Sequence, residues 1–248
     1  MKKFVYLSIC ISCLIHFELH AQSKVPDYVK EFNKQNPAPE GTYYSIKDAK
    51  IHPEKVIHLT LVGLNTFPIE LLKFKNLTEL NLDNNEIASI PSWIQNLKKL
   101  QILNLRRNKL NEIPEFVFYL PSLKELDVWG NSISTFSIDR LLANTKLEYL
   151  NISMNRFSQL PSSIIKLTSL KKLMFENNHL TKIPSEIFKM RNLEYVYLYH
   201  NDISNFDTPD HIESHLKRIN LSHNPIYEFQ IKKLKELLPD CEIEYREF

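Results

Sequence analysis

Histidine and cysteine are the residues of this chain that could bind a metal or act as nucleophiles. His211 and His215 lie four residues apart, but the zinc-protease pattern requires Glu directly after the first His, and Ile212 stands there. His200 and His223 lie 23 residues apart and could become neighbours in a repeating fold. Two ligands without a Cys or a third His nearby make a weak zinc site. We therefore expect surface histidines, no metal and no cofactor.

Catalytic motifs built on glycine are missing from the sequence. Gly41, Gly63 and Gly130 are too far apart for a phosphate-binding loop or a nucleophile elbow, each of which needs glycines within a few residues. Cys241 alternates with Ile243 in a strand-like pattern, which predicts a buried and unreactive thiol. We predict no catalytic residue and no enzymatic activity.

The N-terminal segment has the features of a secretory signal. Lys2 and Lys3 precede a mostly apolar run at 4–17, which is shorter than the roughly 20 residues of a membrane span. Cleavage between Ala21 and Gln22 is the expected processing step. The mature chain would then be secreted or held in the cell envelope, in the periplasm or on the outer surface.

Two other interpretations of this segment remain open. One is a short buried helix, which the lysines in front and the polar stretch behind disfavour. The other is a bacterial lipoprotein lipidated at Cys13, because Ser12 is the small residue expected before such a cysteine. Cys10 and the apolar Leu14-Ile15 do not fit that motif.

Charge is nearly balanced once the signal is removed. The full chain has 31 basic and 29 acidic residues, and loss of Lys2, Lys3 and Glu18 leaves a net charge of +1. This balance gives no attraction to nucleic acid or to an anionic membrane. Cys241 is then the single cysteine, so an internal disulfide is impossible and the core alone must hold the chain together.

An asparagine recurs through most of the chain within a constant apolar frame. The spacing is 23 residues, with one step of 24. In the clearest copies, apolar residues stand eight, five and three positions before the asparagine, and an Ile-Pro or Leu-Pro pair follows it. The recurring positions are Asn85, Asn108, Asn131, Asn155, Asn178, Asn201 and Asn224.

This frame resembles the leucine-rich-repeat pattern L-x-x-L-x-L-x-x-N-x-L over about residues 54 to 245. The 23-residue period with Ile-Pro is similar to that of secreted bacterial leucine-rich-repeat proteins. The resemblance implies an α/β solenoid, a right-handed coil with a concave parallel β-sheet and convex short helices or 3-10 turns. It also implies that a protein partner binds to the concave face.

Elementary geometry favours the same fold. Leu80 and Leu82 alternate with polar residues, as in a short strand with one buried face, and only stacked neighbours can complete that core. The amide of each recurring asparagine can bind backbone groups of adjacent coils and form a ladder. In the first repeat Val62 stands at this ladder position. The recurring prolines should begin the return segment, where a fixed φ suits the first turn of a short convex helix, and they are Pro91, Pro114, Pro161 and Pro184.

The predicted organisation is a signal peptide at 1–21, an N-terminal cap at 22–53, eight leucine-rich repeats at 54–237 and a C-terminal capping strand at 238–248. Within the cap, residues 45–50 should form a short helix against the first coil. Terminal segments of a repeat array are expected to be atypical because one side lacks a neighbour. What lies outside the repeats is too short for a catalytic domain.

Side chains between the buried frame positions should face the concave surface. They are mainly polar in repeats two to four and largely aromatic in repeats four to seven. Because strands lie about 4.8 Å apart, three repeats span only about 15 Å, which predicts one contiguous aromatic patch. Tyr, Trp, Met and Arg are typical of interface hot spots. The predicted protein-binding residues are Asp83, Arg106, Trp129, Tyr149, Met174, Tyr195, Tyr197 and Tyr199.

These patterns favour a non-catalytic, exported module that binds a protein partner through the aromatic patch. A competing explanation of the patch is that aromatic side chains simply pack laterally and favour strands. A second function class is a cell-surface adhesion or structural protein with diffuse contacts. A specific module concentrates its binding energy in the patch, whereas an adhesin spreads salt-sensitive binding over the charged repeats.

Overall fold

The chain forms two compact units in the computed structural model, Met1–Thr42 and Tyr43–Phe248. The predicted signal at 1–21, with its cleavage and lipidation sites, lies outside the described residues, as does the first half of the predicted cap. The repeats all belong to the second unit. The described residues are 38–138, 146–207, 209 and 211–246.

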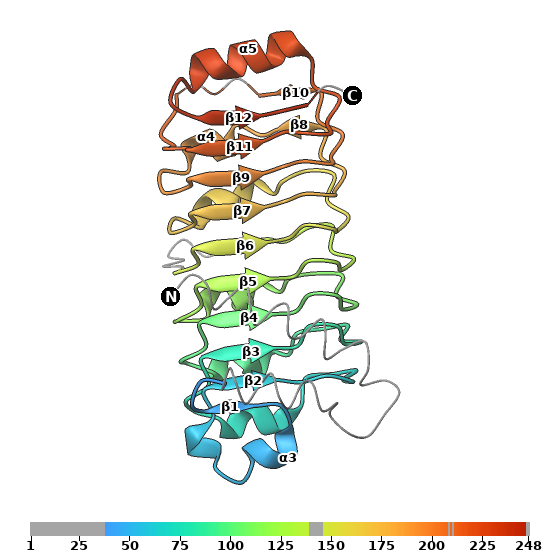
Figure 1. Ribbon diagram of the computed structural model, residues 1–248, viewed down its shortest axis with the longest axis vertical. Coiled ribbons are helices and arrows are strands. Elements are labelled where there is room, and N and C mark those ends of the chain that lie inside the picture. The colour runs from blue at the N-terminus through green and yellow to red at the C-terminus, as the bar shows by residue number, and fades with distance from the viewer. Residues whose placement is uncertain (1–37, 139–145, 208, 210, 247–248) are drawn as a thin grey trace. The chain divides into compact units, whose positions relative to one another are not determined.

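Short strands stack into one parallel sheet along the second unit (Figure 1). Strands that follow one another along the repeats are also neighbours in the sheet, so each coil contributes one strand. This confirms the predicted parallel sheet. β1 (Thr42–Tyr43) spans the boundary between the units. The other strands of this sheet are β2 (His58–Thr60), β3 (Glu79–Asn81), β4 (Ile102–Asn104), β5 (Glu125–Asp127), β6 (Tyr149–Asn151), β7 (Lys172–Met174), β9 (Tyr195–Tyr197), β11 (Arg218–Asn220) and β12 (Glu242–Glu244).

The core lies behind the sheet and is built from the repeated apolar frame. Leu80, in the middle of β3, is fully buried, and its equivalents in β4 to β11 are buried in the same way. Besides these strand residues, phenylalanines from successive coils pack against one another and form a row along the core. Ring centroids along this row, from Phe118 through Phe136 and Phe157 to Phe175, are 5.2, 6.0 and 5.4 Å apart. Burial of one such side chain stabilises the fold by roughly 1.5–3 kcal/mol, and a single coil could not provide it.

The recurring asparagines bind the backbone of two coils at once. Nδ2 of Asn155 donates to the carbonyl oxygens of Ile152 in its own coil and Val128 in the preceding coil, at 3.1 and 3.0 Å. Its Oδ1 accepts the backbone N–H of Ile133 at 3.0 Å. The same three contacts recur at Asn85, Asn108, Asn131, Asn178, Asn201 and Asn224.

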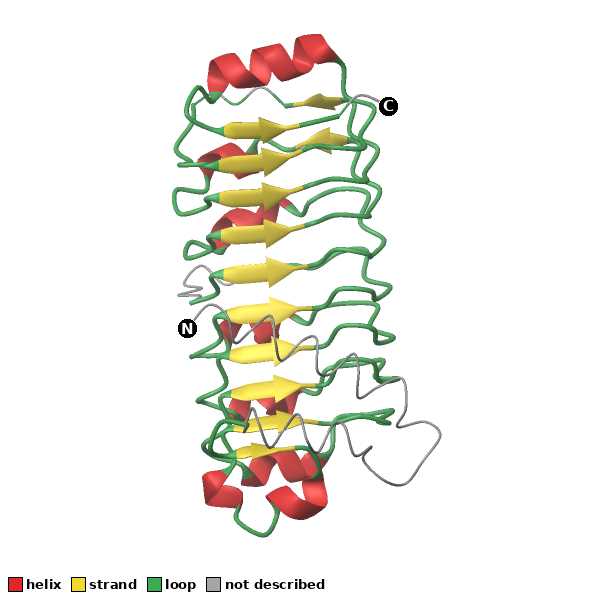
Figure 2. Cartoon of the chain, in the orientation of Figure 1, coloured by secondary structure: helices red, strands yellow, loops and turns green. Residues whose placement is uncertain are grey.

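Short helices cover the side of the coils opposite the sheet (Figure 2). The prolines do not begin these helices: Pro91, Pro114 and Pro161 precede them by one residue, and Pro184 precedes its helix by two. Pro91 has a ψ of 144°, and its carbonyl accepts the N–H of Ile94 at 3.1 Å, so it caps the helix in an extended conformation. Pro114 and Pro161 do the same. The helices are η1 (Pro53–Lys55), η2 (Ile69–Lys73), η3 (Ser92–Asn96), η4 (Glu115–Tyr119), η5 (Ser162–Lys166) and α4 (Glu186–Lys189).

A second, smaller sheet was not predicted. β8 (Lys182–Ile183) and β10 (Asn205–Phe206) pair in parallel on the return side of two neighbouring coils. Phe206 packs against Phe188 of α4, with ring centroids 6.3 Å apart. Directly after β10, Asp207 stands where the preceding coil has Pro184, so this position keeps its N–H, which donates to the Ile183 carbonyl at 3.0 Å and extends the pairing between the two coils.

The first coil departs from the predicted alignment. β2 pairs with β3 so that Leu59 lies opposite Leu80, a step of 21 residues, and Leu59 and Leu61 are the buried pair. The turn after β2 is two residues shorter than in later coils, and Gly63 completes it with a φ of +72°. Val62 is 38% exposed. The prediction that Val62 occupies the ladder position was therefore wrong, because this turn has no residue equivalent to the ladder asparagine.

Helices lie near both ends of the second unit. α3 (Ile46–Ala49) forms within the predicted segment, and the Ser45 hydroxyl accepts a backbone N–H of its first turn at 3.1 Å, as an N-cap should. α5 (Glu228–Leu237) buries Ile231 and Leu234 against the core. None of the helices in the described ranges is long and apolar enough to cross a membrane.

Replacement of one ladder asparagine should be costly. Asn155→Ala leaves the N–H of Ile133 and three backbone carbonyls without their side-chain partner, so we expect a loss of about 2–4 kcal/mol in the free energy of unfolding. Urea unfolding followed by circular dichroism measures it. Asn205→Ala is the control, because this exposed side chain bonds the Ser204 hydroxyl, at 3.4 Å, and no other described residue, so its loss should cost under about 0.5 kcal/mol. Equal effects at both positions would contradict the ladder.

Candidate binding surface on the concave face

Three side chains of each coil point away from the core, and together they form the concave face. In the coil of β6 they are Tyr149, Asn151 and Ser153, which alternate with the core residues Leu150 and Ile152. Because the coils stack in register, equivalent residues line up in three rows across the strands. The chemistry of the face is therefore decided by which residues become neighbours within a row.

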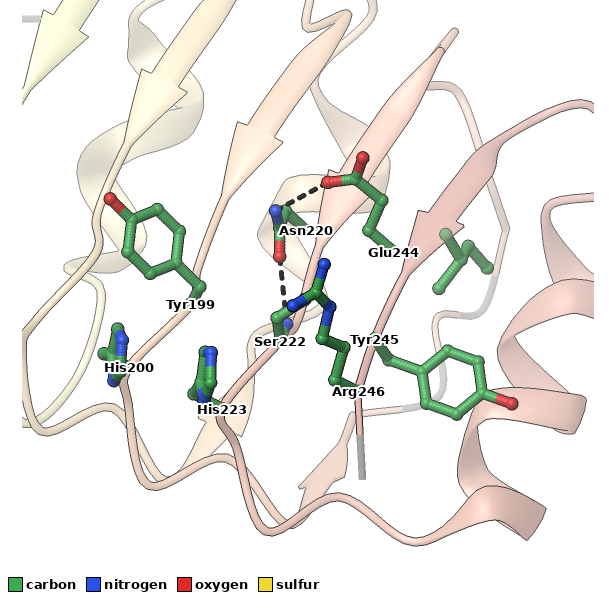
Figure 3. Close-up of a pocket in the computed structure, with 9 residues that line it drawn as sticks. Tyr199, His200, Asn220, Ser222, His223, Glu244, Tyr245 and Arg246 are labelled. Atoms are coloured by element: carbon green, nitrogen blue, oxygen red, sulfur yellow. Dashed lines mark hydrogen bonds between the residues drawn. The ribbon is translucent and has the colours of Figure 1, made fainter. Parts of the chain in front are cut away.

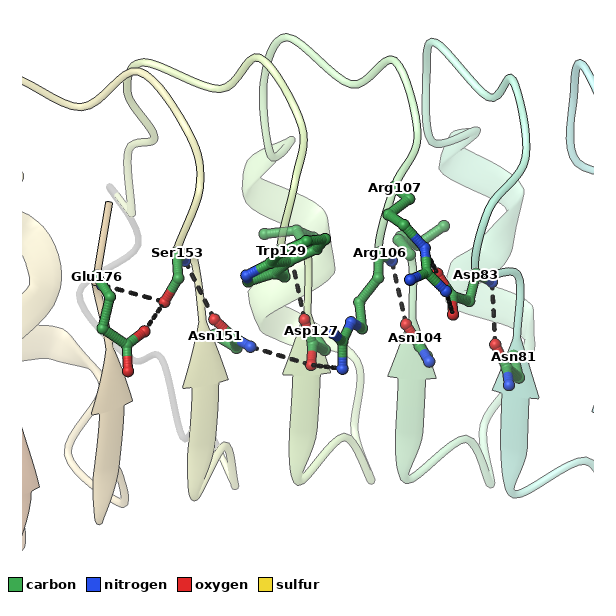
Figure 4. Close-up of polar contacts among 12 residues, drawn as sticks. Asn81, Asp83, Asn104, Arg106, Arg107, Asp127, Trp129, Asn151, Ser153 and Glu176 are labelled. Carbon is green, nitrogen blue, oxygen red and sulfur yellow. Dashed lines mark hydrogen bonds and ion pairs between the residues drawn. The ribbon is translucent and has the colours of Figure 1, made fainter. Parts of the chain in front are cut away.

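The coils of β3 to β5 carry ion pairs on this face (Figure 4). Asp83 is 3% exposed, and its Oδ1 accepts a hydrogen bond from Nε of Arg107 at 3.1 Å. The guanidinium of Arg106 lies 5.0 Å from the centroid of the Trp129 ring, and its Nη1 is 4.0 Å from Asp127 Oδ2. Asp83, which the sequence assigned to partner binding, is thus buried and already paired.

Asp127 is held in a poorly solvated position in the middle row. Burial raises the pKa of its carboxyl to about 6, although the nearby Arg106 charge opposes the shift. Oδ1 accepts the Trp129 N–H at 3.0 Å and Oδ2 accepts from the Asn151 amide at 3.1 Å, which also favour the ionised form. Because desolvation outweighs these partners, this carboxyl changes charge near pH 6.

Glu176 is another buried carboxyl of the face. It is 3% exposed, and it is bonded to the hydroxyl of Ser153 in the preceding coil. Its Oε1 makes no hydrogen bond to any described residue. Burial raises the pKa of this carboxyl, and the Asp127 charge adds to the shift. Burial likewise raises the pKa of the Tyr149 and Tyr199 hydroxyls, with a further contribution from the Glu176 charge.

Tyrosines dominate the face from β6 to β9. The ammonium of Lys172 lies 5.6 Å from the centroid of the Tyr149 ring and 5.0 Å from that of Tyr197, and Lys217 lies 6.0 Å from that of Tyr195. Such cation–π contacts hold the rings in place. These tyrosines are half-buried, so each keeps part of its surface open. We call the following residues the tyrosine group: Tyr149, Met174, Tyr195, Tyr197 and Tyr199.

The sequence matches the family described as Leucine rich repeat over residues 55–110, 75–133, 98–157, 121–180 and 168–226. Together these matches cover more than half of the chain. The chain belongs to the leucine-rich-repeat family. This family is in general a scaffold for protein interaction rather than catalysis. No match is found among curated proteins.

Solved leucine-rich-repeat structures share the fold. A leucine-rich-repeat protein of Leptospira interrogans is 26% identical, with a TM-score of 0.61 over 77% of this chain and 55% of that one. The functional domain of InlJ from Listeria monocytogenes, which includes a cysteine ladder, is 21% identical, with a TM-score of 0.57 over 78% and 44%. A chain from the complex of Latrophilin 3, Unc5D and FLRT2 is 20% identical, with a TM-score of 0.61 over 93% and 88%. The present chain spans about half the length of the first two.

The predicted binding residues of this leucine-rich-repeat chain lie on neighbouring coils, but polar residues interrupt one row of them. In the row that contains Trp129, backbone contacts between coils place Ser153 and Glu176 between Trp129 and Tyr199. Trp129 contacts the guanidinium of Arg106, and the tyrosine group begins in the next coil with Tyr149. That these residues form one binding patch stays a prediction.

Asp127, Lys172 and Glu176 are charged residues of the face that were not among the predicted binding residues. Strand alternation places all of them on the concave side, so that signal was available. Their surroundings were not predictable in the same way, because their partners lie on adjacent coils and depend on the register between strands. A charged residue in a repeat is usually solvated, and nothing local marks these as exceptions.

Metal and nucleophile chemistry gains no support in the described part of the chain. It has no cluster of three or more His, Cys, Asp or Glu side chains that could hold a metal ion. His211 contacts Glu213 at 2.9 Å and His215 contacts the carbonyl of Arg191 at 3.0 Å. Cys241 packs against the edge of the core, and burial raises the pKa of its thiol to about 11, which makes it a poor nucleophile at neutral pH.

The raised pKa of Asp127 predicts a specific pH dependence of stability. A carboxyl with a higher pKa in the folded state than in the unfolded state destabilises the fold as pH rises from about 4 through 6. Asp127→Asn removes this effect, so its free energy of unfolding relative to wild type should increase by about 2–3 kcal/mol between pH 4 and pH 7.5. Any constant cost of the amide cancels, because only the change with pH is compared. Urea unfolding at both pH values measures it, and parallel pH profiles would show that Asp127 titrates normally.

Proposed function

We propose that this chain is a non-catalytic binding module that holds a protein partner against the concave face, with the tyrosine group as the centre of the interface. The observation that carries the proposal is the arrangement around Lys172, whose ammonium lies over two tyrosine rings of neighbouring coils. Four tyrosines and a methionine are thereby gathered on adjacent strands.

The physical properties of this group suit binding. A half-buried tyrosine that is already held by its neighbours loses little rotamer entropy when a partner covers it. Its ring supplies a large contact area, and its hydroxyl can bond to a polar group at the edge of the contact. Tyr and Trp are also the residues most enriched among interface hot spots. By contrast, Asp83 and Arg107 already form an ion pair, so a partner that binds the polar coils would gain less binding energy there.

A leucine-rich-repeat relative supports the general function. The FLRT2 chain that shares the present fold belongs to a complex with Latrophilin 3 and Unc5D. Lateral packing of the tyrosines without any partner is the competing explanation of the same arrangement. Diffuse adhesion through the charged coils is another. Mutation of the face separates all three.

Removal of three tyrosines should abolish capture of a partner. Purified residues 22–248 are used as bait for surface and medium fractions of the source organism, beside a variant with Tyr195→Ala, Tyr197→Ala and Tyr199→Ala. Loss of clustered hot-spot side chains is expected to weaken capture at least tenfold, because each contributes about 1–2 kcal/mol or more. Trp129→Ala, tested separately, should have a smaller effect. Quantitative mass spectrometry of the captured proteins measures the ratio.

The matched control for this experiment is Tyr227→Ala with Phe229→Ala. These rings are 64% and 65% exposed and lie at the start of α5, away from the strands of the sheet. Thermal melting establishes that each variant is folded. Equal capture by wild type and the tyrosine variant would leave lateral packing as the explanation. If moderate salt abolishes capture equally for wild type and for the aromatic variants, the result would instead favour diffuse adhesion.

We also propose that the chain is exported. The support is the charged start and apolar run at the N-terminus, followed by a small residue at Ala21. Expression of the full sequence in a Gram-negative host should yield a mature protein that begins at Gln22. Intact-mass measurement of the envelope and medium fractions tests this. A mass that still includes residues 1–21 would contradict export, and a lipid-modified chain beginning at Cys13 would support the lipoprotein interpretation instead.

A further inference from the structure

A shallow hollow lies at the C-terminal end of the concave face, where the last coils meet (Figure 3). Its residues come from the turns after β9 and β11 and from β12 with the residues that follow it. Nothing in the proposed function uses this hollow, apart from Tyr199 at its edge. The lining residues that carry the argument are Tyr199, His200, Ser222, His223, Glu244 and Arg246.

His200 and His223 occupy turn positions that do not require histidine. Both have a positive φ, of 54° and 56°. Asn84 and Asn177 stand at the equivalent places of earlier coils with φ values of 55° and 53°. Arg107, Gly130 and Met154 occupy this position in other coils, so the turn accepts several residue types and does not select for histidine.

The two imidazole rings are stacked in parallel. Their centroids are 4.3 Å apart and their planes differ by 1°. A metal ion bound to a histidine nitrogen lies in the plane of that ring, and two parallel planes share no such position. The observed arrangement thus disfavours chelation of one metal by His200 and His223. It suits an oxyanion, because separate oxygen atoms of one group can each accept an in-plane N–H from one ring.

Other groups of the hollow strengthen its preference for an anion. Arg246 is exposed and has no ion-pair partner among the described residues. The Ser222 hydroxyl likewise forms no hydrogen bond within the described part of the chain. Glu244 is the carboxylate of the hollow, and Asn220 donates to its Oε2 at 2.6 Å, while Nη1 of Arg218 lies 3.6 Å from its Oε1. Arg218 pairs more closely with Glu242, at 2.7 Å, so the charges of these side chains and Arg246 balance. The preference for an anion therefore rests on the direction of the imidazole, hydroxyl and guanidinium donors and not on net charge.

We propose that this hollow binds a sulfate or phosphate group, with His200, His223 and Arg246 as its ligands and the Ser222 hydroxyl as a further donor. Figure 3 shows the two rings side by side on neighbouring coils, whereas Tyr245 points away toward α5. The group is either a free anion or a substituent of a sugar, since the hollow is open enough to admit the rest of such a molecule. Only the oxyanion is specified by the residues.

The first test is titration of residues 22–248 with inorganic sulfate, followed by the imidazole C–H signals in NMR spectra. We expect saturable shifts of the His200 and His223 signals, with the His179 signal as an internal reference. His179 is exposed and lies near Asp202, outside the hollow. The double variant His200→Asn with His223→Asn should fold, because Asn occupies this turn elsewhere, and it should bind sulfate at least tenfold more weakly when measured by calorimetry.

Arg246→Gln provides an independent variant at an exposed position, and it should also weaken sulfate binding about tenfold, the usual effect of a lost charge-assisted hydrogen bond. His179→Asn is the matched control and should bind like wild type. Unsaturable shifts, or equal shifts at His179, would overturn the proposal. So would tight binding of Zn²⁺ that depends on both histidines in the absence of any sulfate binding.

Glucose 6-sulfate and glucose distinguish the sources of the anion. Tighter binding of glucose 6-sulfate than of inorganic sulfate would support a sulfated or phosphorylated sugar as the ligand. Equal binding of the two would support a free anion. Binding of unmodified glucose with the same strength would show that the oxyanion is not recognised, which contradicts the proposal. Each comparison is independent of whether the tyrosine group binds a protein.

Discussion

The structure depends on the fact that no coil can complete its own core or its own backbone hydrogen bonds. A three-residue strand buries one apolar face on its own coil, but its backbone groups and its turn require the next coil. The ladder asparagine is the point at which this dependence is concentrated. One amide bonds carbonyls of two coils and accepts an N–H from the earlier one, so the spacing of the coils and the direction of the turn are fixed together. The sheet, the core row of phenylalanines and the rows of the concave face all follow from that fixed spacing.

Because the spacing of the coils is fixed, outward-facing side chains of adjacent coils become neighbours whether or not their charges and polarity are complementary. Asp83 and Arg107 meet as complementary charges, which stabilises both. Asp127 and Glu176 lie two coils apart with neutral neighbours between them, and burial disfavours the charge of each. An unpaired buried acceptor such as Glu176 Oε1 costs roughly 1–3 kcal/mol. The core and ladder tolerate that cost because they do not depend on the face, and sites that retain such costs are often functional.

The fold was predictable from the sequence to the extent that its signals are local and repeated. The 23-residue period, the Leu80–Leu82 alternation and the helical segment after Ser45 each require only residues close in sequence. The first coil was not predictable in the same way, because its turn is two residues shorter and pairing, not alignment, determines which leucines are buried. The sequence predicted prolines within the first helical turn, whereas Pro91 lies just before it, because a fixed φ suits both the cap position and the first turn. The candidate site was predicted only in outline. Tyr197 could be placed on the face by alternation, but the position of Lys172 over its ring depends on the register between coils.

The division of the concave face also bears on where binding energy can arise. Coils whose charges are already paired offer a partner little, because a new contact must replace an existing one before it adds anything. The tyrosine group and the hollow differ in this respect. Tyr199 contacts the ring of His200, with centroids 5.4 Å apart, so the two features meet at one pair of residues. Open ring surface, the exposed Arg246 and the Ser222 hydroxyl lie on the coils of β6 to β12, while Asp83 and Asp127 of the coils of β3 to β5 already lie beside arginines. Both proposed binding surfaces therefore lie toward the C-terminal half of the solenoid, where fewer existing ion pairs must be broken before a new contact forms.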